Sequence, residues 1–290
     1  MELPTEYLRQ TLELLEPLCA AKGSIGVKHV QSALGKAARI GYILPDVSPF
    51  ISSLWGGFRA GRMQAAEEKQ GASKHRLPIR RFSVAAKWFC TMLREALNQE
   101  DFGAAALRRI MNKNRSKLFC PDLPVITFDA SPWGGGGILW RQGKPVQYTH
   151  FRWSSLTLQI TKTVSGDCRG QTAFEFLTLF LVAVVFGSVL QTSGALIRGD
   201  NLSALNVALN LNSTSTAMNA IAREVAWRRI VLGWQYRLRH LPAEKNDEAD
   251  ALSRLHAVPS RAFPSKELQG AEYVMPPAQN VGLWKARLVL

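Results

Sequence analysis

Four acidic residues in the C-terminal half of this chain stand where a folded domain ordinarily avoids a charge. Asp129 and Asp200 each end an apolar, strand-like segment, and Glu175 is the sole charged residue of a long apolar helix. Asp250 follows Asn246 by one helical turn, so their side chains share a helix face. Because an uncompensated buried carboxylate is costly, such acids are commonly hydrogen-bonded or bound to a cation. All four are therefore candidate metal ligands.

Each acid also has an ordinary structural explanation. Asp129 could cap a turn, and Asp200 could be the N-cap of the helix that follows it. Glu175 could face solvent near the start of its helix, where the helix dipole favours an acid, and Asp250 could be a surface residue. These explanations hold for each acid singly and leave the grouping of the four unexplained.

The grouping itself favours a metal site. A mixed sheet with this order of elements can bring the four acids to one edge, where they repel one another unless hard cations lie between them. Ligation by oxygen alone favours Mg²⁺ or Mn²⁺ over zinc. Two such ions, about 4 Å apart, would activate a water molecule and stabilise the leaving oxygen in phosphodiester hydrolysis.

The segment after Pro121 carries the elements that must position these acids. β-Branched and aromatic runs alternate with apolar helical stretches, which predicts an α/β domain with a mixed sheet. Residues 134–137 are four glycines and are expected in a loop. The expected order is strands 125–129, 138–140 and 146–151 as an antiparallel meander, helix 173–190, strand 195–199, helices 202–209 and 218–232, strand 234–239 and helix 247–255.

The chain before this segment is predicted to be helical. Leucines at helical spacing indicate an all-helical segment over residues 1–60. Residues 61–120 are expected to be a basic connector that begins with a polar linker at 61–75 and contains helices at about 82–98 and 104–111. Residues 121–256 would form the α/β domain, and the prolines after residue 256 indicate an irregular tail over 257–290.

The charge of the chain indicates an anionic partner. The formal net charge is +14, and residues 74–117 alone carry eleven Lys or Arg against three acids. Nucleic acid is the leading candidate, because neutralising its phosphates releases counterions; a solvated helix face is the alternative for the basic stretch. The residues expected to bind nucleic acid are Arg80, Arg81, Lys87, Arg108, Arg109, Lys113, Arg115, Lys117, Asn201 and Asn246.

The cysteines and the apolar stretch constrain location. The four cysteines, at positions 19, 90, 120 and 168, form no CxxC pair, which predicts reduced thiols in an intracellular protein, nuclear or cytoplasmic, and no zinc site. The glutamates among the first leucines fit no signal peptide. Residues 173–190 are at the short limit for a bilayer span, and the strands around them favour a helix in a protein core.

Five short motifs resemble those of type 1 RNase H domains, and the last two are similar to the C-terminal motif of retroelement RNases H. They are TFDAS at residues 127–131, QTAFE at 171–175, RGDN at 198–201, HLP at 240–242 and NDEADALSR at 246–254. The resemblance implies an RNase H-like, five-stranded mixed sheet with flanking helices. It also implies that Asp129, Glu175, Asp200 and Asp250 are the catalytic metal ligands, and that His240 assists proton transfer or product release. By position alone, His240 could equally be a structural residue.

The N-terminal part resembles the thumb of reverse transcriptases from DIRS-type retroelements, in the residues VQSALGK at 30–36 and in 47–55. The palm and its Asp-Asp hairpin are absent, so a palm would have to be supplied in cis or in trans. Residues 152–169 are longer than in compact RNases H and are unassigned. Between Asp200 and His240 the basic, Trp-rich protrusion of cellular RNases H is also missing.

The expected function is hydrolysis of the RNA strand of RNA–DNA hybrids by a metal-dependent, retroelement-derived endoribonuclease with two Mg²⁺ or Mn²⁺ ions. The RNA strand is expected because its 2′-hydroxyls and the groove shape of the hybrid can be recognised without base contacts. Two alternatives remain: a non-catalytic, nucleic-acid-binding remnant that keeps the fold and the charge, and a polymerase-associated subunit that needs a separate palm. None of the three requires a membrane.

Overall fold

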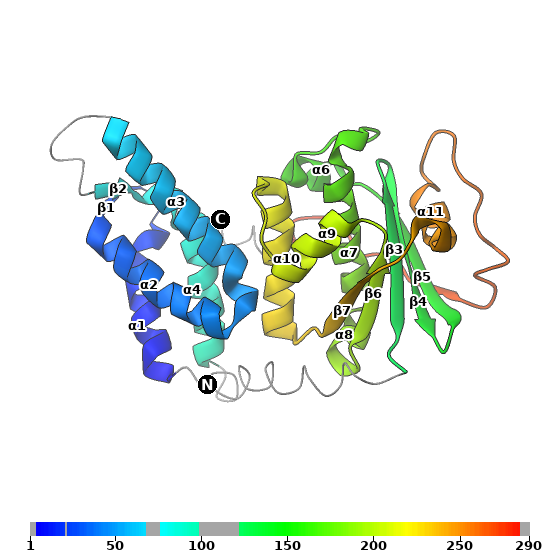
Figure 1. Ribbon diagram of the computed structural model, residues 1–290, viewed down its shortest axis with the longest axis horizontal. Helices are drawn as coiled ribbons and strands as arrows, with labels where there is room; N and C mark the ends of the chain where they lie inside the picture. Colours follow the sequence, from blue (N-terminus) through cyan, green and yellow to red (C-terminus); the bar gives the residue numbers. More distant parts are fainter. Residues whose placement is uncertain (1–3, 21, 68–75, 99–121, 285–290) are drawn as a thin grey trace. The chain divides into compact units, whose positions relative to one another are not determined.

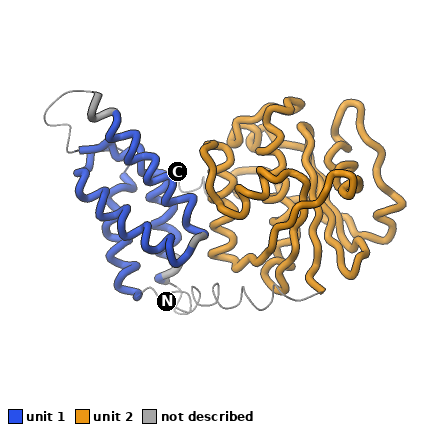
Figure 2. Tube along the Cα trace, viewed as in Figure 1, with its two compact units in different colours: residues 1–112, 286–290 blue, residues 113–285 orange. Residues whose placement is uncertain are grey.

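A computed structural model describes residues 4–20, 22–67, 76–98 and 122–284. These residues fall into two compact units, drawn blue and orange in Figure 2, with the division inside the undescribed stretch 99–121. The boundary expected between residues 60 and 61 falls inside a helix of the first unit. The tail expected from residue 257 belongs to the second unit as far as it is described.

The N-terminal unit is mainly helical, with the helices formed by apolar residues at helical spacing; Leu8 and Leu34, for example, are buried. It is not all-helical as expected, because two three-residue strands pair antiparallel, with Ile25 opposite Leu77. Strands this short leave no alternating pattern in a sequence. The elements are α1 (Thr5–Leu15), η1 (Glu16–Cys19), β1 (Ser24–Gly26), α2 (Val27–Ile43), η2 (Pro45–Val47), α3 (Ser48–Glu67), β2 (Arg76–Pro78), η4 (Ile79–Arg81) and α4 (Ser83–Asn98).

Helix α3 corrects the expected linker. The helix continues through residues 61–67, where the sequence was interpreted as polar and non-periodic. Alanine, arginine, methionine, glutamine and glutamate dominate this stretch, and all have high helix propensity. High propensity therefore sustains the helix where no apolar stripe marks it.

The C-terminal unit contains a six-stranded mixed sheet in the order β7-β6-β3-β4-β5-β8. The meander β3-β4-β5 is antiparallel as expected, whereas β6 pairs parallel with β3 and β7 parallel with β6. A mixed α/β fold is thus confirmed, with six strands in place of five. The strands are β3 (Val125–Ser131), β4 (Gly134–Arg141), β5 (Lys144–Arg152), β6 (Ala195–Gly199), β7 (Tyr236–His240) and β8 (Glu272–Tyr273).

Helices cover both faces of this sheet (Figure 1). The long apolar helix α7 (Gln171–Val185) packs on β3 and β4. Helix α9 (Leu202–Asn210) packs against α7 and β7, and α10 (Thr216–Leu232) packs against α7 and α9, while α11 (Asp247–Ser253) contacts β3 and β4 from the opposite face. β3 is therefore buried along almost its whole length. The expected helix 173–190 is two helices, since α7 ends before α8 (Gly187–Thr192), and the unassigned residues 152–169 include α6 (Ser155–Thr161).

The four glycines at residues 134–137 lie in strand β4 and not in the loop expected from their composition. A Cβ atom on Gly136 would come within 2.4 Å of Leu252 Cβ on α11, and one on Gly137 within 2.6 Å of Val182 on α7. Real Cβ atoms essentially never come so close. The glycines therefore let two helices approach opposite faces of one strand.

The tail is ordered against the sheet and against the helices. β8 adds to the edge of β5 in parallel, and Gln147 Nε2 donates a 2.9 Å hydrogen bond to Glu272. Further along, Arg228 donates to the carbonyl of Leu283 at 2.8 Å, and the buried Trp284 lies against Phe180. The expectation of an irregular tail is thus wrong for β8. Two residues are too few to show a strand pattern.

One helical stretch of the described residues, Cys168–Val185, is long and apolar enough to cross a membrane. In the structure 56% of that window is buried inside the protein. A core helix of this kind passes the same length and composition test, so the stretch is weak evidence for a membrane span.

Candidate metal centre

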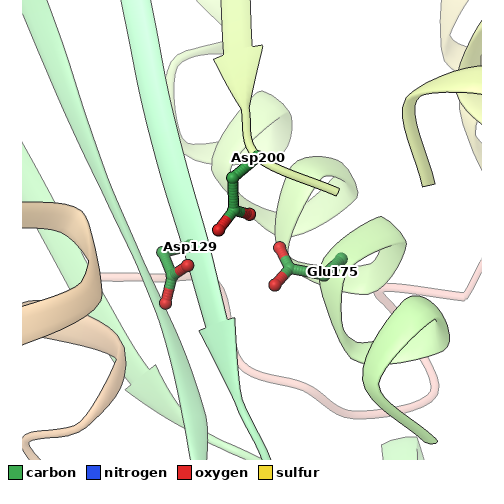
Figure 3. Close-up of side chains that lie close together, drawn as sticks. All are labelled: Asp129, Glu175 and Asp200. Carbon is green, nitrogen blue, oxygen red and sulfur yellow. The ribbon is translucent and has the colours of Figure 1, made fainter. Parts of the chain in front are cut away.

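Three of the expected acids converge where the parallel strands β3 and β6 reach their carboxyl ends (Figure 3). Thr127 pairs in parallel register with Arg198, so two residues later Asp129 on β3 and Asp200 after β6 lie side by side. Glu175, in the second turn of α7, points toward both. One carboxylate oxygen from each of the three lies within 4.8 Å of the others. This acidic triad, Asp129, Glu175 and Asp200, could bind a metal ion.

The triad is unfavourable for negative charge in the absence of a cation. Asp129 is 5% exposed and Glu175 is 3% exposed. Burial, with the nearby charge of Asp200, raises the pKa of Asp129 to about 7. Burial and the charges of Asp129 and Asp200 raise the pKa of Glu175 well above its ordinary value. The electrostatics therefore favour either protons or a bound cation at this place.

The ordinary explanations of these three acids do not describe the structure. Asp129 lies inside β3, which runs on to Ser131, and so caps no turn. Asn201 is the N-cap of α9, because its side-chain oxygen accepts a 2.9 Å hydrogen bond from the amide of Ala204. Asp200 is thus left without the capping role, and Glu175 is buried instead of facing solvent.

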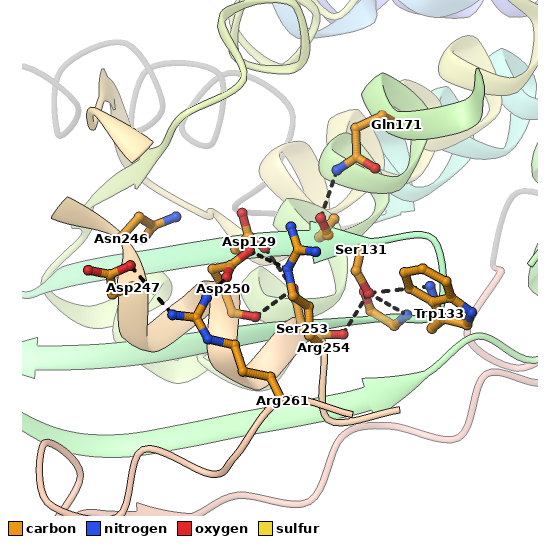
Figure 4. Close-up of polar contacts among 12 residues, drawn as sticks. Asp129, Ser131, Trp133, Gln171, Asn246, Asp247, Asp250, Ser253, Arg254 and Arg261 are labelled. Atoms are coloured by element: carbon orange, nitrogen blue, oxygen red, sulfur yellow. Dashed lines mark hydrogen bonds and ion pairs between the residues drawn. The ribbon is translucent and has the colours of Figure 1, made fainter. Parts of the chain in front are cut away.

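Two polar side chains that the sequence interpretation missed hold the triad (Figure 4). Ser253 Oγ, on α11, donates a 2.7 Å hydrogen bond to Asp129 Oδ2. Gln171 Nε2 donates to Glu175 Oε1 at 2.8 Å and to the carbonyl of Ala130 at 2.7 Å. Gln171 stands one helical turn before Glu175, a spacing that could have indicated it. Ser253 is distant in sequence from Asp129, and its place in the motif at residues 246–254 indicates no contact with that acid.

Buried oxygen atoms without partners point to a cation. Glu175 Oε2, Asp200 Oδ1 and Asn246 Oδ1 are buried and have no hydrogen-bond partner among the described atoms. All three residues line one pocket of about 490 Å³, together with Asp129 and Asn201. Unpaired buried acceptors are uncommon in proteins, and oxygen-rich pockets suit hard divalent cations. The residues present therefore fit a Mg²⁺ or Mn²⁺ ion.

Asp250 lines the same pocket but is compensated differently. Its carboxylate accepts a hydrogen bond from Arg254 Nε at 2.6 Å and pairs through its other oxygen with Arg261 (Figure 4). It is not a member of the three-carboxylate cluster. Asn246, on the same helix face as expected, donates from Nδ2 to the carbonyl of Phe128 at 2.9 Å. Asp250 therefore lies at the side of the pocket, called the rim below, where Arg254 and Arg261 supply the positive charge that was expected from a metal ion.

The remaining predicted residues lie in three places. His240 ends β7 opposite Gly199, next to the strand that leads to Asp200; it is exposed and does not line the pocket. Asn201 and Asn246 line the pocket, and their side chains are engaged by Ala204 and Phe128 as described above. Of the basic residues, Arg80, Arg81 and Lys87 lie on η4 and α4 of the N-terminal unit. The others are outside the described residues: Arg108, Arg109, Lys113, Arg115 and Lys117.

No protein-family model matches this chain, and no curated protein matches it with significant similarity. The resemblance to RNase H therefore rests on the motifs alone. The capacity to bind a metal rests on separate ground, the convergence of three carboxylates and the unpaired oxygens beside them.

Proposed function

We propose that the C-terminal unit is a metal-dependent nuclease of RNase H type that hydrolyses the RNA strand of RNA–DNA hybrids. The observation that carries the proposal is the convergence of Asp129, Glu175 and Asp200 from β3, α7 and the end of β6. The three belong to three of the five motifs that resemble RNase H. The six-stranded mixed sheet, with its antiparallel meander followed by parallel strands, is compatible with such a fold.

The side chains of the centre divide the work between binding and orientation. Asp129, Glu175 and Asp200 would hold Mg²⁺ or Mn²⁺, which when bound supplies an activated water and charge stabilisation for phosphodiester hydrolysis. Ser253 and Gln171 each fix one carboxylate by a hydrogen bond, so the ligands are oriented before a cation arrives. A polar pocket open to solvent leaves room for a phosphate beside the triad.

His240 and the asparagines would act at the substrate side of the centre. His240 is exposed at the end of β7, beside the strand that delivers Asp200, which suits a proton carrier that moves between solvent and the site. Asn201 and Asn246 line the pocket and would face the nucleic-acid backbone. The choice of the RNA strand comes from the family resemblance and from the recognition of 2′-hydroxyls.

The ion pairs of Asp250 support the second candidate, a non-catalytic, nucleic-acid-binding remnant. As a fourth metal ligand, Asp250 would have to exchange Arg254 and Arg261 for a cation. In a remnant the arginines would keep Asp250 permanently. In an enzyme, either the three triad carboxylates would be sufficient for catalysis, or Asp250 would release Arg254 and Arg261 when the metal binds.

The direct test is cleavage of a defined hybrid. The full chain is incubated with 5′-labelled RNA annealed to DNA, in Mg²⁺, in Mn²⁺ or in EDTA, and with single-stranded RNA, duplex RNA and duplex DNA as other substrates. We expect metal-dependent cuts in the RNA of the hybrid only. Asp129→Asn and Asp200→Asn should each abolish them, because each removes a ligand charge at nearly constant shape.

Asp167→Asn is the matched control, since Asp167 belongs to the same unit and pairs only with Arg169 among the contacts described for it. This variant should cleave like the parent. If folded parent protein binds the hybrid without cutting it in either metal, the enzyme proposal fails and the remnant is favoured. Cleavage of duplex DNA in preference to the hybrid would overturn the proposed substrate.

A further inference from the structure

Two cysteines of the N-terminal unit form a thiol pair that the sequence did not indicate. Cys19 ends η1, and Cys90 lies in α4. Although they are 71 residues apart in the chain, their Sγ atoms are 3.5 Å apart and share a hydrogen bond. Both are free thiols in the structure. Their spacing along the chain gave no reason to connect them, and the fold brings them into contact.

The two thiols have different surroundings. Cys90 is fully buried, whereas Cys19 is partly exposed, and its Sγ also lies 3.6 Å from the carbonyl oxygen of Leu15 as an alternative acceptor. The hydrogen bond with Cys90 lowers the pKa of Cys19, and the positive charges of Arg94 and Lys87 act in the same direction, whereas partial burial and the charge of Glu16 oppose the shift without cancelling it. Arg94 is held near by a 2.8 Å ion pair with Glu16. An accessible, activated thiol thus stands directly beside a buried one.

We propose that Cys19 and Cys90 are a redox-sensitive pair, in which a hydroperoxide oxidises Cys19 and Cys90 then closes a disulfide between η1 and α4. The pair lies in the helical unit, so this inference does not depend on the proposed nuclease function.

The reaction balances with the hydroperoxide as the only oxidant. The Cys19 thiolate attacks one peroxide oxygen, so that an S–O bond forms, the O–O bond breaks, and water or an alcohol leaves after taking a proton. Cys90 then attacks the sulfur of the sulfenic acid, an S–S bond forms, and the hydroxyl leaves as water with the Cys90 proton. Two thiols lose two electrons in total, and one peroxide gains them.

The geometry requires only a small displacement. A disulfide bond is about 2 Å long, so the sulfurs must approach by roughly 1.5 Å. Cys19 stands at the end of a short 3-10 turn and is followed by Ala20 with an extended backbone, so it can supply that movement more readily than Cys90 inside α4. The closed bond would join two segments that are distant in sequence and thereby stabilise the helical unit against unfolding.

The test uses the full chain with Cys120→Ser and Cys168→Ser, which removes the other two thiols and so prevents links through them. This parent is treated with hydrogen peroxide, alkylated and digested with trypsin. We expect peptides 10–22 and 88–94 to appear as one cross-linked species, lighter by two hydrogens than their sum, and to separate again after dithiothreitol. A Cys19 that ends as sulfinic acid with no cross-link would overturn the proposal, as would two thiols that stay reduced.

A second measurement separates a specific link from general oxidation. The Tm of the helical unit should rise by several degrees in the oxidised parent and return after reduction. Cys19→Ser should show neither the cross-link nor the rise, and since Cys19 is partly exposed this variant folds even if Cys90→Ala does not. An equal rise of Tm in Cys19→Ser would assign the effect to another site and contradict the proposal.

Discussion

Two acidic regions of the same pocket are compensated in different ways. In the triad, Asp129 and Glu175 are buried and Asp200 is partly buried, and the three carboxylates make no ion pair with a described basic residue. Asp250, on α11, is also partly buried and pairs with Arg254 and Arg261. The protein therefore neutralises the rim with its own cations and leaves the interior without one.

This difference in charge compensation distinguishes acids that are suited to bind a metal from an acid that is already paired within the protein. The charge of an acid that is paired with arginines is compensated without a ligand. Buried acids that repel each other are not compensated, so a hard cation that binds between them stabilises the folded protein. The triad thus lowers the stability of the metal-free fold and raises the affinity for a metal ion, whereas the ion-paired Asp250 does neither. Four changes break or sharpen this comparison.

The largest effect is expected for loss of a triad carboxylate. Asp200→Asn should eliminate the rise in Tm that Mn²⁺ produces in the parent, because the two carboxylates that remain are too few to hold the cation. Asp250→Asn should keep most of that rise, since its arginines and not a metal compensate Asp250. Thermal unfolding over a Mn²⁺ titration measures both. Equal loss in the two variants would show that Asp250 leaves its arginines to bind the metal, and the comparison would not hold.

The second effect is on pH dependence. Burial raises the pKa of Asp129 from 3.8 to about 7, so the folded state keeps a proton that the unfolded chain releases between these values. Metal-free protein should therefore lose stability from this group as pH rises from about 4 to 7. Asp129→Asn should remove the loss and make the metal-free protein more stable at pH 8, by an amount on the order of 4 kcal/mol.

Urea unfolding of parent and Asp129→Asn in metal-free buffer from pH 4.5 to 8 measures this contribution together with the linked change at Glu175, whose pKa the charge of Asp129 raises. Titrating groups that do not interact with Asp129 cancel in the difference. In saturating Mg²⁺ the order should reverse, with the parent the more stable at pH 8. A difference that does not change with pH would mean that Asp129 is ionised in the folded protein without a cation.

The third effect concerns the support of Asp129 from α11. Ser253→Ala removes the 2.7 Å hydrogen bond to Asp129 and should weaken Mn²⁺ binding by about tenfold, as outer partners of metal ligands commonly do. Ser131→Ala is the matched control, because Ser131 Oγ donates to the carbonyl of Ser253 at 2.7 Å without touching the triad. Calorimetric titration should find Mn²⁺ affinity lowered in the first variant only. A similar drop in both would assign the effect to the packing of α11.

The smallest effect is expected at the rim. Arg261→Gln removes one partner of Asp250 from a pair whose side chains are 44% and 22% exposed. Solvent screens such a pair, so stability should change by less than about 1 kcal/mol, and Mn²⁺ affinity should stay unchanged. Denaturant unfolding and the same titration are sufficient. A loss of more than about 2 kcal/mol would show that the rim contributes as much as a buried centre.

The sequence predicted those features that depend on local pattern. The strands β3, β5, β6 and β7 and the helices α7, α9 and α10 follow from alternation and apolar periodicity, and Glu175 was recognisable as one charge in an apolar helix; α6, the break between α7 and α8, and the first half of β4 were not predicted. The hydrogen bond from Ser253 to Asp129 was not predictable, because it joins residues 124 positions apart. The glycines of β4 looked like a loop, since nothing local shows that α7 and α11 must approach there. The pairing of Asp250 with Arg261 likewise depends on how the chain turns after α11.

The position of Ser253 near the end of the α/β unit has a consequence for synthesis on the ribosome. Asp129 emerges early, on a strand that becomes central, while β6 and α11, which complete its surroundings, emerge much later. Until α11 has emerged, Asp129 lacks its hydrogen-bond donor, and the glycine-rich strand β4 has one face without cover. Covering β4 and completing the hydrogen bonds of the metal centre are therefore the same late event, so a chain that stops short of Ser253 lacks both.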